Sequence, residues 1–534
     1  MRNFIDQNNN SADAVIEVTA PAGRIIGRSD GYVRRFLGIP YAAAERWQRP
    51  RPLPRGAVIE ALAYGPAPWQ DDGPGCAIMP AWRSAQCLNL NLYTSSAETE
   101  EKRPVMVWIY GGAQIAGSNV GMHAPGPGLP ELSYDGRFFV REHPEIVLVV
   151  PNYRVGLWGS LDLSCLEGTN DAYRESANSA RLDILQCLRW LRENVAAFGG
   201  DPDNITLFGQ SAGSSNITAL MLMPEAQGLF QKVICESSFA MDISLTSRND
   251  SRRISEALFS LLCCKTLDEA LAKTDEELLR AQQSLAAASM GGSSAFSDIE
   301  SKLFSPVVDG VTIPEDYWRR FLLGGSRAVR FLGGTNIGEY DQQFLPMNGD
   351  ADAARRFTIA QNWGKLDPER GTAPEETARF LSRYTEIRSA FEACEDLKAD
   401  LYLRMGAIAW ALVCSQFGSA YLYHLALPRP DGRRFGHGEE IPMLFGTDSE
   451  TPLIQQRALR DAWCTFARIG DPNCPALRTR WLPFTAQHWE TLLLDEKPRL
   501  VHGVRPEDCR ALLPLFRETR EYPDFSALCA QYEG

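Results

Sequence analysis

Short apolar runs recur along the chain, and each has the length of one buried strand. They lie at residues 105–110, 146–151, 205–208 and 232–236, with two further candidates at residues 330–333 and 420–425. Strands that are covered on both faces of a parallel sheet have this brief, continuous apolar character. The pattern therefore predicts a mostly parallel central sheet.

Between these runs, apolar residues take the spacing of a helix. Leucine, valine and phenylalanine recur every three or four positions from residue 182 to residue 198, and Gly199 and Gly200 end the pattern. Residues 250–300 and 350–415 are rich in Ala, Leu, Glu and Arg, which predicts large helical insertions around the sheet. We expect an α/β protein, with helices on both faces of the sheet, in a single domain spanning residues 1–534.

The composition argues against several classes of partner. Of the 534 residues, 44% are hydrophobic, and the formal net charge is −13. Nucleic acids and anionic membranes bind basic patches, so an acidic chain favours neither partner. The N-terminal residues lack the basic start and apolar run of a secretory signal, and every apolar run falls far short of the ~20 residues of a membrane span. We therefore expect a cytoplasmic protein.

Metal chemistry has little support in the pattern. The thirteen cysteines show no CxxC spacing, and the six histidines are dispersed along the chain. Several cysteines lie in apolar segments, where a thiol packs as a small hydrophobic group. Zinc sites are usually built from closely spaced ligand pairs, which this chain lacks. We expect no metal site.

The most specific signal is the segment Gly209-Gln210-Ser211-Ala212-Gly213. It follows a predicted strand and precedes a helical run. A tight strand-to-helix turn needs small residues on both sides, and it lifts the serine hydroxyl above the sheet edge at the N-terminus of a helix. This context is typical of the α/β-hydrolase fold and makes Ser211 the candidate nucleophile.

A serine hydroxyl is a poor nucleophile at neutral pH, so the chain has to supply a histidine and a carboxylate. In this fold class the order along the chain is serine, acid, histidine, each in a loop after a strand. His437 lies in a glycine-flanked loop after the strand candidate at 420–425, whereas His424 lies within that strand and fits a structural role. His437 is therefore the candidate base.

Three carboxylates are candidates for the acid of such a triad. Glu339 and Asp341 both follow the turn after residues 330–333, which places them at the same edge of the sheet as the serine. Asp309 is a weaker third candidate. The acid has to orient the histidine and stabilise its charge, and either of the first two meets that need. Spacing alone does not choose between Glu339 and Asp341.

The oxyanion of a tetrahedral intermediate needs preorganised hydrogen-bond donors. Residues 108–113 end a strand in a glycine-rich loop, so backbone N–H groups of this loop and that of Ala212 can point at one oxygen. Side chains have to be very small where a backbone approaches a substrate so closely. The segment Gly111-Gly112-Ala113 meets this condition.

Together these segments resemble the type-B carboxylesterase and lipase family, which includes the cholinesterases and the bacterial para-nitrobenzyl esterases. The resemblance runs from FLGIPYA at 36–42 to FARIGDPN at 466–473, and includes NYRVG at 152–156, FGGDP at 198–202 and PVVDG at 306–310. Several such segments in the right order are far more specific than any one of them. The resemblance implies a carboxylesterase of the bacterial kind.

The family's pattern also implies roles for individual residues. It indicates Glu339 rather than Asp341 as the acid, and it implies that Ser237 supports that acid by hydrogen bonding. It implies three oxyanion donors, the backbone N–H groups of Gly112, Ala113 and Ala212. No cofactor is implied, and the partner is a small-molecule ester; the oligomeric state stays open.

The chain departs from the family's pattern at several positions. Ala113 replaces the third glycine of the oxyanion loop, which keeps the N–H group but narrows the pocket. Gln210 replaces a glutamate that many relatives have, which removes a negative charge and weakens the case for cationic esters. Residues 85–86 replace an acidic pair, so an ion pair common in the family is missing. Cys76 and Cys87 align with a disulfide of secreted members, and we expect both to be reduced in a cytosol.

We expect a serine carboxylic ester hydrolase that acts on small to medium esters through a covalent acyl-enzyme. Ser211 attacks, His437 shuttles the proton and Glu339 orients His437. A lipase, amidase or carbamate hydrolase of the same mechanism is an alternative, although residues 117–132, rich in Gly and Pro, are more typical of a gorge-lining loop than of an apolar lid. A non-catalytic binding protein fits less well, because the full triad is present and no membrane anchor is visible.

Overall fold

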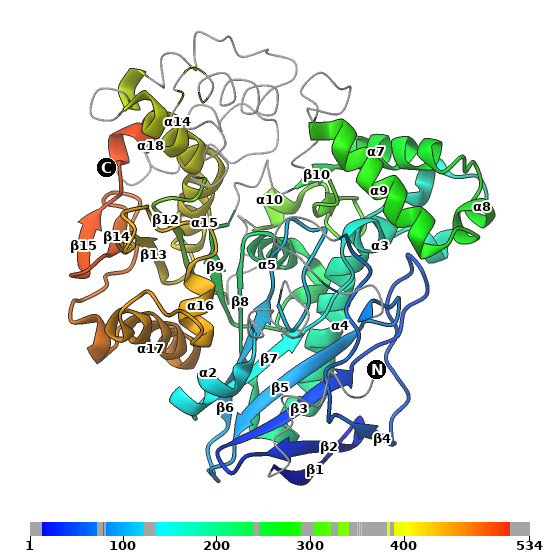
Figure 1. Cartoon of the computed structure of the whole chain (residues 1–534), viewed down its shortest axis with the longest axis horizontal. Coiled ribbons are helices and arrows are strands. Elements are labelled where there is room, and N and C mark those ends of the chain that lie inside the picture. The colour runs from blue at the N-terminus through cyan, green and yellow to red at the C-terminus, as the bar shows by residue number, and fades with distance from the viewer. Residues whose placement is uncertain are drawn as a thin grey trace.

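A computed structural model of the protein describes residues 13–71, 78, 82–121, 134–238, 245–290, 303–321, 329–340, 350, 352, 354, 382–384 and 389–512. In this part of the chain, one sheet of thirteen strands forms the centre, with helices packed around it (Figure 1). The strands are β1 (Ala14–Ala20), β2 (Gly23–Ser29), β3 (Val33–Pro40), β4 (Ala57–Glu60), β5 (Asn89–Ser95), β6 (Arg103–Ile109), β7 (Val147–Pro151), β8 (Gly200–Gln210), β9 (Lys232–Glu236), β12 (Arg330–Asn336), β13 (Ala420–Leu425), β14 (Glu490–Leu494) and β15 (Arg499–His502).

The sheet is parallel in its middle and antiparallel at both ends. Its order is β1-β2-β3-β5-β7-β6-β8-β9-β12-β13-β14-β15, with β4 beside β2. Every pair from β7 to β14 is parallel. The pairs from β1 through β7, and the last pair, β14 with β15, are antiparallel. The mostly parallel centre confirms the prediction, whereas the antiparallel arm at the N-terminal end was not foreseen.

The central strands form where the apolar runs predicted them. All residues of β6, β7, β9 and β13 are buried, as expected for strands that are covered on both faces. The predicted runs at 232–236 and 420–425 coincide with β9 and β13, and the other four runs lie largely within β6, β7, β8 and β12. In contrast, β2 alternates between buried and partly exposed residues, so it carries no continuous apolar run.

Helices follow the strands in the order that a parallel sheet requires. The helices are α2 (Gly136–Glu142), α3 (Gly156–Gly159), α4 (Ser179–Asn194), α5 (Ala212–Leu222), α7 (Arg248–Leu261), α8 (Leu267–Leu271), α9 (Asp275–Met290), α10 (Tyr317–Arg320), α14 (Ala390–Ala399), α15 (Met405–Cys414), α16 (Glu440–Phe445), α17 (Leu453–Ile469) and α18 (Pro506–Leu512). A 3-10 turn at Val195–Phe198 extends α4, and Gly199 ends it with a φ of 84°.

The two faces of the sheet are covered by different helices. Phe208 of β8 packs against Phe139 of α2, with ring centroids 6.3 Å apart. A Cβ placed on the next residue, Gly209, would lie 3.2 Å from the side chain of Ile217 in α5. Because successive residues of a strand point to opposite faces, α2 and α5 lie on opposite sides of β8.

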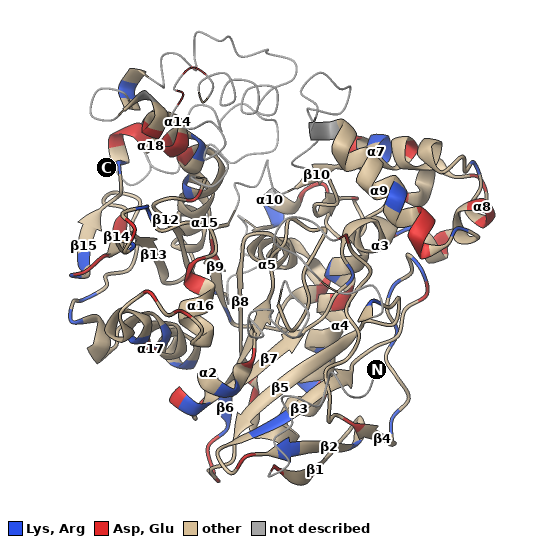
Figure 2. Cartoon of the chain, in the orientation of Figure 1, with Lys and Arg blue, Asp and Glu red and all other residues tan. Residues whose placement is uncertain are grey.

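Helices occupy the described parts of both predicted helical regions, residues 250–300 and 350–415, of which residues 291–300 and most of 351–388 lie outside the described residues. Helices α7, α8 and α9 pack around a second apolar core that includes Trp158. Helix α15 packs against β12 and β13, and α14 precedes it across a π-helical turn at Asp400–Arg404 (Figure 1). Figure 2 shows the central strands almost free of charged residues, whereas acidic residues gather on outer helices such as α9 and α14.

No helix in the described part of the chain is long and apolar enough to cross a membrane. The longest described helix, α17, has 17 residues and carries arginine and aspartate side chains along its length. A span of a typical bilayer needs about 20 predominantly apolar residues.

A buried ion pair ties the end of the central strands to α4. Arg154, just after β7, donates from Nε and Nη2 to the two carboxylate oxygens of Asp183 at 2.8 and 2.7 Å. The backbone N–H of Arg154 donates to the same carboxylate at 3.0 Å. Both side chains are almost fully buried. Removing one partner of such a pair leaves an uncompensated charge in a low-dielectric interior.

We therefore expect Asp183→Asn to lower the free energy of unfolding by about 3–5 kcal/mol. The exposed pair Arg55–Glu193 offers a matched control, since Glu193→Gln is expected to cost under about 1 kcal/mol. Urea unfolding followed by fluorescence measures both. Equal, small losses in the two variants would contradict a structural role for the buried pair.

Candidate active site

The motif serine lies in a strained turn between β8 and α5. Ser211 has φ 58° and ψ −124°, and its N–H donates to the carbonyl of Glu236 at 3.0 Å. A Cβ on Gly213 would lie 2.0 Å from the carbonyl oxygen of Ile109, and one on Gly209 would lie 2.4 Å from that same oxygen. Both flanking positions therefore exclude any side chain, which is the physical reason for the small residues of the motif.

The structure brings the candidate acid and base together. Glu339 lies after β12 and is buried, and its Oε2 lies 2.6 Å from Nδ1 of His437. The two loops are joined by backbone pairing, since the N–H of Gly338 donates to the carbonyl of Phe435 at 2.8 Å. Asp341, the competing candidate, lies outside the described residues. Asp309 instead accepts three backbone N–H groups of its own turn, so it is occupied elsewhere.

Glu339 is held by two further donors. The hydroxyl of Ser237 and the backbone N–H of Asn336 both donate to its Oε1, each at 2.6 Å. Ser237 is fully buried and has a φ of 50°, a conformation that non-glycine residues seldom adopt. With His437 on the other oxygen, both oxygens of the carboxylate are engaged and its orientation is fixed.

The carboxylates around His437 favour its protonated form. Burial by itself lowers the pKa of this imidazole, but the hydrogen bond and charge of Glu339, with the charge of Glu440, outweigh it. The pKa of His437 is raised above its ordinary value of 6.5 as a result. The charge on the ring forms next to a carboxylate that can stabilise it.

The other ring nitrogen of His437 contacts Gln210. Its Nε2 lies 3.1 Å from the side-chain amide nitrogen of Gln210. Among the described contacts there is no hydrogen bond between Ser211 and His437. Such bonds are often long in unliganded enzymes and shorten when substrate binds. The Gln210 contact was not anticipated, because a residue's rotamer is not visible in a sequence.

The glycine-rich loop after β6 presents free N–H groups. Ala113 and Gln114 have φ values of 53° and 65°, and the Gln114 amide donates to the carbonyl of Ala212 at 3.2 Å. Within the described residues, the N–H groups of Gly112, Ala113 and Ala212 have no hydrogen-bond acceptor. Ala113 is exposed, so its methyl group faces open space rather than the core. The arrangement suits an anionic oxygen.

Two further buried carboxylates lie behind Glu339. Glu440 accepts from the Asn336 amide at 2.5 Å, and Glu236 accepts from the Trp463 indole at 2.6 Å. Burial raises the pKa of both groups; the charge of Glu440 raises that of Glu236 further, and the charge of Glu339 raises that of Glu440. Neither residue was predicted from the sequence. Only their positions in the sequence pointed to the site, because Glu236 directly precedes Ser237 and Glu440 closely follows His437.

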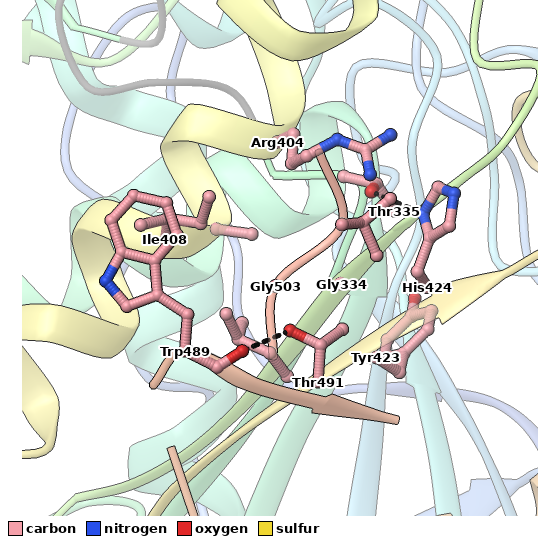
Figure 3. A pocket seen from close by; sticks show the side chains of 12 residues that line it. Gly334, Thr335, Arg404, Ile408, Tyr423, His424, Trp489, Thr491 and Gly503 are labelled. Atoms are coloured by element: carbon pink, nitrogen blue, oxygen red, sulfur yellow. Dashed lines mark hydrogen bonds between the residues drawn. The ribbon is translucent and has the colours of Figure 1, made fainter. Parts of the chain in front are cut away.

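His424 belongs to a different part of the molecule. It lies opposite Thr335 in the register of β12 and β13, and its Nδ1 lies 3.2 Å from the Thr335 hydroxyl (Figure 3). It lines a small cavity of about 20 Å³ together with Arg404 and Ile408. Burial, followed by the charge of Arg404, lowers the pKa of His424 well below 6.5. The structural role expected for His424 is consistent with this position.

Two further expectations concern the cysteine pair Cys76 and Cys87 and the metal ligands. Cys87 is buried with a free thiol, and burial raises the pKa of this thiol to about 12, while Cys76 lies outside the described residues. In the ranges described, no cluster of three or more His, Cys, Asp or Glu side chains has the geometry to hold a metal ion.

Comparisons with known proteins identify the family of the chain. A model of the carboxylesterase family matches residues 14–512. The para-nitrobenzyl esterase of Bacillus subtilis is 30% identical over 522 residues, which cover 93% of this chain and 98% of that protein. The liver carboxylesterase of Sus scrofa is 28% identical, with 85% of each chain covered.

Solved structures give the same result. A para-nitrobenzyl esterase structure superimposes with a TM-score of 0.74 at 29% identity, covering 93% of this chain and 99% of that one. A carboxylesterase from Geobacillus stearothermophilus superimposes with a TM-score of 0.75 at 27% identity and the same coverage. The chain has the α/β-hydrolase fold, belongs to the carboxylesterase family and is a carboxylic ester hydrolase.

Proposed function

We propose that the protein hydrolyses small to medium carboxylic esters through a covalent acyl-enzyme, with Ser211, His437 and Glu339 as its triad. The observation that carries the proposal is the 2.6 Å contact between Glu339 and Nδ1 of His437, beside the strained turn that presents Ser211. A buried carboxylate at Nδ1 leaves the lone pair of the neutral imidazole on Nε2. That nitrogen is then the base.

The steps follow from these groups. His437 Nε2 takes the hydroxyl proton as Ser211 Oγ bonds to the acyl carbon, and the carbonyl oxygen becomes an anion facing the N–H groups of Gly112, Ala113 and Ala212. His437 returns the proton to the departing alcohol oxygen as the ester C–O bond breaks. Water then attacks the acyl-enzyme by the same sequence, with its proton passing through His437 to Ser211 as the acid is released.

Two observations bear on the substrate class. Gln210 is neutral, so the site lacks the carboxylate beside the nucleophile that would attract a cationic alcohol group. The relative from Bacillus subtilis is named for para-nitrobenzyl esters, which are neutral and of moderate size. We expect uncharged aryl and alkyl esters to be the substrates.

We expect Ser211→Ala to lower kcat on para-nitrophenyl esters by about 10⁴-fold to 10⁶-fold, because the nucleophile is lost. The assay compares acetate through decanoate, so the chain length with the highest kcat/KM sizes the acyl pocket. Circular dichroism controls for folding. Comparable turnover in the folded variant would disprove the assignment of the nucleophile, and a maximum at decanoate would disprove the preference for small to medium acyl groups.

Ser237→Ala tests the support of the acid. Removing a hydrogen bond to a charged, buried group costs about 1.5–3 kcal/mol, so we expect kcat to fall about 10-fold to 100-fold with little change in KM. Ser238 is equally buried, and its hydroxyl has no hydrogen-bond partner in the described structure, so Ser238→Ala is the matched control. The role of Ser237 is refuted if both variants retain the wild-type kcat.

A further inference from the structure

The side-chain amide of Gln210 contacts Nε2 of His437, the nitrogen that acts as the base in the proposed reaction. Glu339 accepts the proton of Nδ1, so the neutral ring has a lone pair on Nε2. A group 3.1 Å from that nitrogen has to be a donor, and the amide nitrogen of Gln210 occupies this position. The amide oxygen of Gln210, an acceptor, could bond this nitrogen only if Nε2 carried a proton. The contact therefore selects the neutral, Nδ1-protonated imidazole.

The Gln210 side chain is enclosed between two loops of the site. It is 4% exposed, at the last position of β8. A Cβ on Gly111 would lie 3.3 Å from its amide oxygen, and one on Gly438 would lie 3.6 Å from its amide nitrogen. Gly111 belongs to the oxyanion loop and Gly438 to the histidine loop. The amide thus lies in contact with both loops, and it is packed most tightly against the oxyanion loop at Gly111.

The protonation of His437 depends on the charges around it and on the neutral amide of Gln210. Glu339 lies at Nδ1 of the ring, and the charges of Glu339 and Glu440 both favour the imidazolium. On the Nε2 side, the amide of Gln210 disfavours the imidazolium, because two N–H groups would then face each other. A glutamate at position 210 would reverse this effect and accept a hydrogen bond from the charged ring.

We propose that Gln210 is a positioning residue that holds His437 neutral by donating to Nε2 until the hydroxyl of Ser211 takes over that lone pair. The proposal rests on the assignment of His437 as the base. It follows that Gln210 keeps the enzyme active at lower pH than a glutamate would. Gln210 does not contact the acyl group in this role, so its effect is on the protonation of the base and not on the fit of the ester.

The test is the pH dependence of kcat/KM for para-nitrophenyl butyrate in three variants. In Gln210→Leu the donor is lost, and we expect the acid limb to move up by about half a pH unit. In Gln210→Glu a carboxylate replaces it, and we expect an upward shift of about one unit or more. Gln282→Leu removes a buried amide whose oxygen accepts from the backbone N–H of Leu157, away from His437, so its acid limb should match wild type.

The outcomes separate this proposal from the proposed function. Ser211→Ala is run in the same assay, and turnover that survives in it would overturn the triad itself. If turnover depends on Ser211 but the acid limbs of both Gln210 variants stay within about 0.2 pH unit of wild type, the role of Gln210 is wrong. A downward shift in Gln210→Glu would overturn it as well. Wild-type circular dichroism spectra exclude misfolding as the cause of either shift.

Discussion

The parallel register of β8, β9, β12 and β13 is the constraint on which the site depends. Gln210 pairs with Glu236, Glu236 pairs with Gly334, and Gly334 pairs with Tyr423. Because parallel strands end at the same edge, the residues that follow this row emerge next to one another. Ser211 comes directly after the row in its strand. Groups distant in sequence thus converge at one edge of the sheet.

The convergence gathers negative charge in the interior. Glu236, Glu339 and Glu440 are buried close enough to repel one another, and such charges are costly unless donors compensate them. Glu339 has the most donors and is the carboxylate that meets His437. Glu440 accepts from Asn336 and Glu236 from Trp463, and the pKa values of both groups are raised. A raised pKa favours the neutral carboxyl, which lessens the repulsion in this cluster.

Much of the fold and of the candidate site could be predicted because the signals were local. Strands β9 and β13 are buried on both faces, so their apolar runs are continuous, whereas β2 faces solvent in part and was missed. Ser211 was found from its motif. The choice of Glu339 came from a family resemblance, because Asp341 is only two residues away and spacing does not distinguish them. The contact of Gln210 depends on tertiary packing, which leaves no local pattern.

Several residues at the carboxyl edge of the parallel strands have strained backbone conformations, where backbone segments approach one another closely. Ala113, Ser211 and Ser237 all have positive φ values, which cost of order 1–3 kcal/mol each outside glycine. The turn at Ser211 is possible because Gly209 and Gly213 let β8 and α5 approach the carbonyl of Ile109. The central strands are fully buried, and their packing has to offset this strain. A larger side chain at either glycine would push β8 and α5 away from the carbonyl of Ile109 and move Ser211, so the geometry of the proposed nucleophile and the packing of the core cannot change independently.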